Sequence, residues 1–227
     1  MVDSTFSLIA RDPGNGAIGL AVSTASLAVG KRVPHLLNGV GLVATQGRTN
    51  VRYGTMGLRL LEIGFSPQET LDTLVRLDTH SQYRQVLIAR LTGDWAVHTG
   101  DLTEPWHGHL VTERYVAMGN TLTGPQVLEA MANGFEAASG DLAFRLMAGL
   151  RRGQGKGGDR EGRKSAALVV TSPQQFEPWG ALVDLRVDLD PDPVERLQEL
   201  LERYVVWEAQ KLREVDKGIY GFRAEQA

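Results

Sequence analysis

Helical segments come in pairs between antiparallel strand segments, and this order limits the chain to few folds. Strand-like runs at residues 5–10 and 16–23 flank a turn-forming segment, and runs at 33–38 and 40–45 meet at Asn38-Gly39, a strong hairpin signal. Helical stripes follow at 53–63 and 66–75, and the second opens with a capping box at Ser66-Pro67-Gln68-Glu69. Two hairpins in succession predict an antiparallel sheet.

The same order of elements returns in the second half of the chain. Strand-like runs occupy 84–91, 95–99 and 111–118, helical stripes occupy 125–138 and 142–151, and strand-like runs at 165–171 and 181–187 precede a final helix capped by Asp192. A parallel doubly wound sheet would instead alternate one helix with each strand. We therefore predict an α+β fold, a four-layer α/β/β/α sandwich of two antiparallel sheets. The domain spans residues 1–201, and residues 202–227 form a C-terminal helical tail.

Composition and charge exclude several classes of function. With 24 basic and 27 acidic side chains among 227 residues, the formal net charge of −3 gives no electrostatic basis for binding nucleic acid or an anionic membrane. The absence of cysteine removes thiol nucleophiles, disulfides and cysteine-ligated zinc, so covalent catalysis needs a hydroxyl, an amine or a carboxylate. No apolar run is long enough to cross a bilayer and no signal-peptide pattern opens the chain, so we expect a cytoplasmic protein.

Six stretches of the sequence resemble a known family. They are TFSLIARD at 5–12, VATQGRTN at 43–50, YGTMGLRLL at 53–61, AMGNTLTGP at 117–125, GGDREGRKSAALVV at 157–170 and DLRVDLDPDPVERL at 184–197. The chain resembles the N-terminal-nucleophile (Ntn) hydrolase superfamily, and within it a bacterial and archaeal family known as domain of unknown function 1028. The resemblance implies the same four-layer sandwich and, by analogy, hydrolysis of an amide bond.

The resemblance implies that Thr5 is a nucleophile. In Ntn hydrolases a Thr, Ser or Cys becomes the first residue by self-cleavage, and its side chain attacks an amide while its own α-amine acts as the base. An α-amine has a pKa of about 7.7–8, so near neutral pH much of it can accept the hydroxyl proton. Thr5 begins the first strand, and this role requires the loss of Met1 to Ser4. We expect a small-molecule or peptide amide as substrate and no cofactor.

Five further residues receive supporting roles from the same resemblance. Lys31 stands at about the position where proteasome-type relatives carry a basic residue that helps to lower the pKa of the nucleophile. The resemblance implies that Gly47 supplies a backbone N–H to an oxyanion and that the Asn120 amide either stabilises this oxyanion or orients the free amine. Asp159 and Ser165 stand where such proteins place hydrogen-bond partners of the terminal amine. Each residue also has a structural explanation, because Lys31 fits a solvated strand edge and the others fit turns, caps or loops.

Other functions fit parts of the sequence. His107-Gly108-His109 offers two imidazoles without a carboxylate at useful spacing, so metal-dependent hydrolysis is a minor alternative. Acidic residues gather between 184 and 192, but Asp192 is better explained as a helix cap, and we expect no metal site.

The main alternative is a non-catalytic Ntn-fold protein that keeps its N-terminus and serves in binding or assembly. The sequence does not decide between this function and hydrolysis. The last helix presents Leu201, Tyr204, Val205 and Trp207, which is more apolar surface than an exposed terminal helix usually carries. We therefore expect a homo-oligomer.

Overall fold

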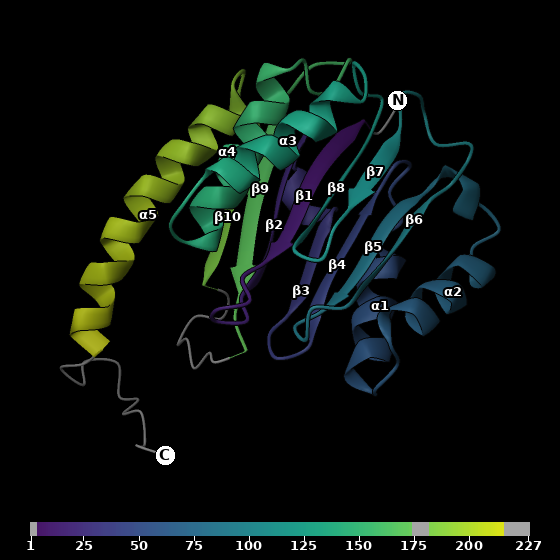
Figure 1. Cartoon of the computed structure of the whole chain (residues 1–227), viewed down its shortest axis with the longest axis horizontal. Coiled ribbons are helices and arrows are strands. Elements are labelled where there is room, and N and C mark those ends of the chain that lie inside the picture. The colour runs from purple at the N-terminus through teal and green to yellow at the C-terminus, as the bar shows by residue number, and fades with distance from the viewer. Residues whose placement is uncertain (1–3, 174–181, 216–227) are drawn as a thin grey trace.

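Two antiparallel sheets stack face to face in the computed structural model, which describes residues 4–173 and 182–215 (Figure 1). The six-stranded sheet has the order β10-β9-β2-β1-β8-β7, and the four-stranded sheet has the order β3-β4-β5-β6. The first sheet contains β10 (Val183–Val187), β9 (Ser165–Thr171), β2 (Ile18–Thr24), β1 (Thr5–Arg11), β8 (Tyr115–Asn120) and β7 (Gly108–Val111). The second contains β3 (Pro34–Leu37), β4 (Gly41–Gln46), β5 (Gln85–Arg90) and β6 (Trp95–Thr99).

Helices cover both outer faces of the stacked sheets. Helices α1 and α2 pack on the four-stranded sheet, whereas α3, α4 and α5 pack on the six-stranded sheet. This arrangement confirms the predicted four-layer α/β/β/α sandwich. The helices are α1 (Arg52–Glu62), α2 (Pro67–Leu77), α3 (Gln126–Ala137), α4 (Leu142–Gly155) and α5 (Pro193–Val215), with short 3-10 helices η1 (Val29–Lys31) and η2 (Ser81–Tyr83).

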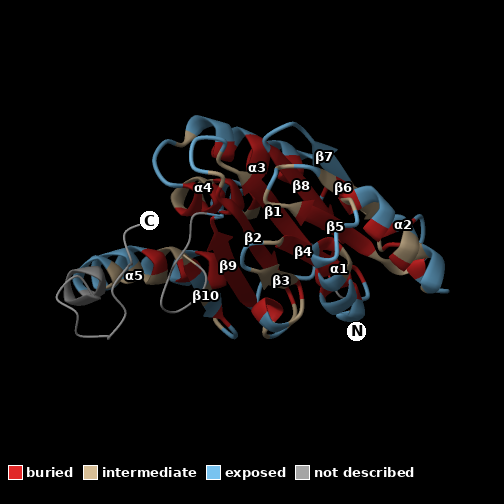
Figure 2. Cartoon of the chain, turned by 90° about the horizontal axis from the view of Figure 1, so that it is seen from below, coloured by how far each residue is buried: buried red, intermediate tan, exposed pale blue. Residues whose placement is uncertain are grey.

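Three apolar cores separate the four layers, and Figure 2 shows that the buried residues concentrate in the sheets. Strand β1 contributes to two of these cores because its side chains alternate between the faces of the sheet. Phe6 and Leu8 pack under α3 and α4, whereas Ile9 packs against the second sheet. A strand covered on both faces needs apolar residues at most positions, which explains the TFSLIA run.

The single strand predicted at 111–118 is wrong. The chain turns at residues 112–114, between β7 and β8. The Thr112 hydroxyl accepts the N–H groups of Arg114 and Tyr115 at 3.2 and 3.0 Å and donates to the Tyr115 carbonyl oxygen at 3.0 Å. Because a threonine side chain makes this turn in place of glycine or proline, the run has the pattern of a strand.

Helix α5 runs without interruption across the predicted boundary between residues 201 and 202. Leu197 and Leu201 are fully buried, whereas Val206 is 61% exposed and Trp207 is 46% exposed. Figure 1 shows the C-terminal turns of α5 extending past the sheet. Among the described helices, none has both the length and the apolar character that crossing a membrane requires.

The central position of β1 predicts slow hydrogen exchange of its backbone amides. Strands β2 and β8 pair with β1 on both sides, and residues 5–10 are buried. We expect the amides of residues 6–10 to exchange far more slowly than those of residues 109–111 in β7, which are exposed. Hydrogen–deuterium exchange with mass spectrometry measures both segments in one sample, and equal exchange would contradict the central placement.

Candidate active site

A row of polar residues crosses the six-stranded sheet at the end where β1 begins. Thr5 is aligned with Thr24 of β2 and with Asn120 of β8, and Thr24 is aligned with Ser165 of β9. All four residues are buried. Because Ile9 lies in the core between the sheets, the side chain of Thr5, four residues earlier on the strand, faces the same space.

The hydroxyl of Thr5 contacts the peptide group that precedes it. Thr5 Oγ1 donates to the carbonyl oxygen of Ser4 at 2.6 Å, and the Thr24 hydroxyl donates to the same oxygen. Thr24 Oγ1 in turn accepts the N–H of Ser26 at 3.2 Å. Ser4 is completely buried. The structure therefore holds two hydroxyls on one carbonyl oxygen, next to the Ser4–Thr5 peptide bond.

Asp159 is the acidic group beside this peptide bond. Its carboxylate accepts the N–H of Ala25 at 2.9 Å and the N–H of Glu161 at 2.8 Å. Burial raises the pKa of the Asp159 carboxyl above its ordinary value, and the hydrogen bonds offset this effect only in part. The Ser4 hydroxyl has no well-formed hydrogen bond, but it faces the carboxyl and also lowers its pKa. A buried carboxyl thus lies on the side of Thr5 where Ser4 is attached.

Gly47 lies beside Asn120. It follows β4 and has a φ of 59°, a left-handed conformation that favours glycine. A Cβ atom at Gly47 would lie 3.1 Å from the Thr103 side chain, 3.2 Å from the Tyr83 carbonyl oxygen and 3.5 Å from Asn120 Nδ2. The Gly47 backbone and the Asn120 amide are therefore neighbours, and both are of the kind that stabilises an oxyanion.

A buried network of amides joins the two sheets behind Thr5. Gln46 accepts the Ser7 hydroxyl at 2.6 Å and donates to Gln85 Oε1 at 2.7 Å. Gln85 Oε1 also accepts from Asn120 Nδ2 at 3.4 Å, and Gln85 Nε2 donates to Thr99 Oγ1 at 3.0 Å. These groups satisfy one another within the protein interior, as buried polar groups must. Gln85 is the centre of the network, although no sequence motif marks it.

Two non-glycine residues next to the cluster adopt left-handed backbone conformations. Arg48 follows Gly47 with a φ of 40°, and Thr121 follows Asn120 with a φ of 57°. Glu104 connects them, because its carbonyl accepts the Thr121 N–H at 3.0 Å and its carboxylate lies 3.7 Å from the Arg48 guanidinium. A β-branched residue in this conformation is strained, and such strain concentrates at functional sites.

Ser165 belongs to the cluster, and Lys31 does not. Ser165 Oγ donates to the Ser26 carbonyl oxygen at 2.7 Å and accepts the Val29 N–H at 3.0 Å, so it fixes the segment between β2 and η1. Lys31 ends η1 and is exposed, and within the described part of the chain no hydrogen bond or ion pair joins it to Thr5. Of the predicted residues, the structure brings together Thr5, Gly47, Asn120, Asp159 and Ser165.

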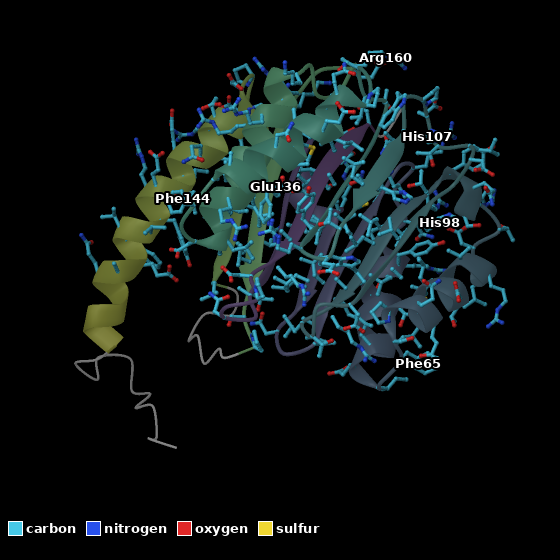
Figure 3. The ribbon with its side chains drawn as sticks, viewed as in Figure 1. Phe65, His98, His107, Glu136, Phe144 and Arg160 are labelled. Atoms are coloured by element: carbon cyan, nitrogen blue, oxygen red, sulfur yellow. The ribbon has the colours of Figure 1, made fainter. Side chains whose placement is uncertain are left out.

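Two of the histidines, His107 and His109, are the ones that the sequence offered as metal ligands. Figure 3 shows His107 and Arg160 at the end where β1 begins, with His98 nearer the middle. His109 Nδ1 lies 2.9 Å from Thr99 Oγ1, and burial, together with the nearby His98, lowers the pKa of His109. The residues that the structure describes contain no group of three or more His, Cys, Asp or Glu side chains able to hold a metal ion.

Comparisons with known proteins place the chain among proteins of unknown function. A family model described as "Family of unknown function (DUF1028)" matches residues 5–197. The crystal structure of the DUF1028 protein SPO2555 from Silicibacter pomeroyi is 33% identical, with a TM-score of 0.80 over 88% of this chain and 85% of that chain. Anbu (ancestral beta-subunit) from Yersinia bercovieri is 12% identical, with a TM-score of 0.43 over 90% of this chain and 96% of that chain. No curated protein matches the sequence.

The buried Asp159 carboxyl makes stability depend on pH. Its pKa is raised in the folded state, so the folded chain holds this proton more tightly than the unfolded chain. The contribution of Asp159 to stability is therefore fully present below its unfolded pKa of about 3.9 and is lost as the pH rises through the folded pKa. Asp159→Asn has no carboxyl to titrate, so this loss is absent in the variant. We therefore expect the difference in unfolding free energy, variant minus wild type, to increase from about pH 4 to about pH 7.

Urea denaturation at both pH values measures this difference. The exposed Asp101→Asn is the matched control and should show a smaller change with pH. A relative stability of Asp159→Asn that stays constant or falls as the pH rises would contradict the assignment.

Proposed function

The chain belongs to the DUF1028 family, and from this premise we propose that it is an Ntn-type hydrolase that cleaves the amide bond of a small molecule or peptide. Thr5 is its nucleophile. The residues before Thr5 are removed by self-cleavage of the Ser4–Thr5 peptide bond, and this step frees the α-amine that acts as the base.

One observation carries this proposal. The Thr5 hydroxyl lies 2.6 Å from the carbonyl oxygen of the adjoining Ser4–Thr5 peptide group, in a fully buried site. A hydroxyl held rigidly against an amide carbonyl has already lost much of the entropy that an attack requires. Thr5 lies at the start of a central strand, so its position is fixed by pairing on both sides. A threonine that only filled space in the core would not need this polar surrounding.

Groups next to Thr5 can stabilise and position its free α-amine. Asp159 lies on the side of Thr5 where Ser4 is attached, which is where cleavage creates the amine. A carboxylate at this place can stabilise the ammonium that forms when the amine accepts the hydroxyl proton. Ser165 supports the arrangement from β9 by fixing the segment that carries Ser26.

Gly47 and Asn120 fit the stabilisation of a substrate oxyanion. Gly47 is buried beside the Asn120 amide, so one substrate oxygen held between them can accept from the Gly47 N–H and from Asn120 Nδ2. Gln85 accepts from the amide of Asn120 and fixes the orientation of that amide. Lys31 receives no role in this mechanism, because it is exposed.

A protein that kept Met1 to Ser4 would have a different function. In an uncleaved chain the Thr5 nitrogen is part of a peptide bond and the Thr5 hydroxyl donates to the buried Ser4 carbonyl oxygen, so Thr5 lacks the α-amine that the reaction needs. Such a chain would serve in binding or assembly. Covalent labelling of Thr5 distinguishes the two functions.

We expect protein with a free Thr5 amine to gain the mass of a β-lactone probe, and Thr5→Val to gain none. Valine preserves the branched shape of threonine and removes only the oxygen that attacks. The labelling rate should rise with pH through about 7–8, as the α-amine loses its proton. Intact-mass spectrometry measures both results.

Two outcomes of this experiment would contradict the proposal. Equal labelling of the wild type and Thr5→Val would place the reactivity at another residue. Absence of labelling in protein that demonstrably begins at Thr5 would favour the binding protein.

We also propose that α5 mediates self-association. Val206 and Trp207 are 61% and 46% exposed, which is unfavourable for a helix that faces water alone. Truncation after Leu201 should reduce the mass measured by light scattering, because it removes this apolar face. A full-length protein that is already a monomer, with the same state after truncation, would contradict this expectation.

A further inference from the structure

We infer that Thr24 is a catalytic residue of the self-cleavage step, in which its hydroxyl stabilises the oxyanion that forms on the Ser4 carbonyl oxygen. This inference rests on the proposed function, because it concerns the reaction that frees Thr5. It assigns a role to a residue that the sequence motifs do not mark.

The direction of the Thr24 hydroxyl is fixed by its surroundings. Thr24 Oγ1 accepts the Ser26 N–H at 3.2 Å, and its own proton points to the Ser4 carbonyl oxygen. The strand register holds Thr24 opposite Thr5, and the whole of β2 is buried. A donor that is already oriented costs little reorganisation when negative charge develops on the oxygen.

The Thr5 hydroxyl cannot remain a hydrogen-bond donor to the Ser4 carbonyl oxygen during the reaction. Thr5 Oγ1 also donates to the Ser4 carbonyl oxygen, at 2.6 Å. Thr5 loses its proton when its oxygen attacks the carbonyl carbon, so it stops being a donor as the oxyanion appears. Thr24 remains as the side-chain donor on that oxygen.

Gly47 does not supply this donor. Among the hydrogen bonds of the described residues, none joins the Gly47 N–H to the Ser4 carbonyl oxygen. Its neighbours are Thr103, Tyr83 and Asn120. Self-cleavage and substrate hydrolysis therefore use different oxyanion donors, Thr24 for the first reaction and the Gly47–Asn120 pair for the second.

The reaction balances without a cofactor. Thr5 Oγ1 forms a bond to the Ser4 carbonyl carbon, and the carbon–nitrogen bond of the Ser4–Thr5 peptide breaks. The hydroxyl proton passes to the nitrogen, which becomes the α-amine of Thr5, and the product is an ester. Water then adds to the ester carbonyl, the bond to Oγ1 breaks, and Oγ1 regains a proton while Ser4 leaves as a carboxylic acid.

Thr24→Val tests this role in the full-length chain. The wild type and the variants are made by cell-free translation, and intact-mass spectrometry follows the loss of Met1 to Ser4 over time. Removing one oxyanion donor typically costs about 10²–10³ in rate, so we expect Thr24→Val to cleave at least about 100-fold more slowly. Thr24→Ser keeps the hydroxyl and should cleave within about threefold of the wild type, as an intact donor predicts.

Thr171→Val is the matched control. Thr171 is a buried threonine at the opposite end of the same sheet, where it is aligned with Ile18, and its hydroxyl donates to Asn38 Oδ1 at 2.9 Å. This variant should cleave at the wild-type rate. Thermal melting of each variant shows whether it is folded, and the Thr24→Ser result decides the matter if Thr24→Val does not fold.

The outcomes separate this inference from the proposed function. Cleavage of Thr24→Val at the wild-type rate would overturn the role of Thr24 and leave Thr5 as nucleophile. A strong loss of cleavage in folded Thr24→Ser would also overturn it, because the hydroxyl is still present. A wild type that stays uncleaved would overturn self-cleavage itself, and with it both proposals.

Discussion

The antiparallel register of β1 is the constraint on which the candidate site depends. Pairing with β2 and β8 aligns Thr5 with Thr24 and Asn120, so three polar side chains from distant parts of the sequence meet at one sheet end. Strand side chains alternate between faces, and a slip of one residue would turn Thr5 toward the helices. Such a slip would place the hydroxyls of Thr5 and Ser7 in the apolar core under α3 and α4, without their hydrogen-bond partners, and the cost of burying unpaired polar groups opposes it.

Hydrogen bonds join many of the buried polar groups at this end of the sandwich. Ser7, Gln46 and Gln85 form a continuous chain of hydrogen bonds between the sheets. Asp159 receives two backbone N–H groups, which reduce the cost of burying a carboxyl. Such a network rigidifies the surroundings of Thr5, and a rigid surrounding is what positions a nucleophile. We propose that the hydrogen bonds that hold this end of the sandwich together also fix the Thr5 hydroxyl in place for its attack.

Much of the fold could be predicted from the sequence, because the period of the apolar pattern changes between strands and helices. The paired helices indicated the four layers, and the turn at Asn38-Gly39 showed the second hairpin directly. The strand predicted at 111–118 was wrong because Thr112 forms a turn that no glycine or proline marks. Thr24 and Gln85 were missed for another reason. Thr24 contacts Ser4, and Gln85 contacts Gln46, from segments that become neighbours only in the folded sheets, and local patterns do not contain such pairings. Asp159 and Gly47 lie in stretches that resemble the family, so the sequence could single them out. Only the structure shows that Lys31 is exposed.

We propose that the working protein begins at Thr5, so that the attacking hydroxyl and the basic amine are on the same residue. The most direct measurement is the N-terminal residue of the purified wild-type protein, determined by N-terminal sequencing together with intact mass. We expect a chain that starts with Thr5-Phe6-Ser7 and lacks the mass of Met1 to Ser4. A homogeneous protein that still carries Ser4 after prolonged incubation would contradict it, because the Thr5 nitrogen would then remain an amide without a basic lone pair.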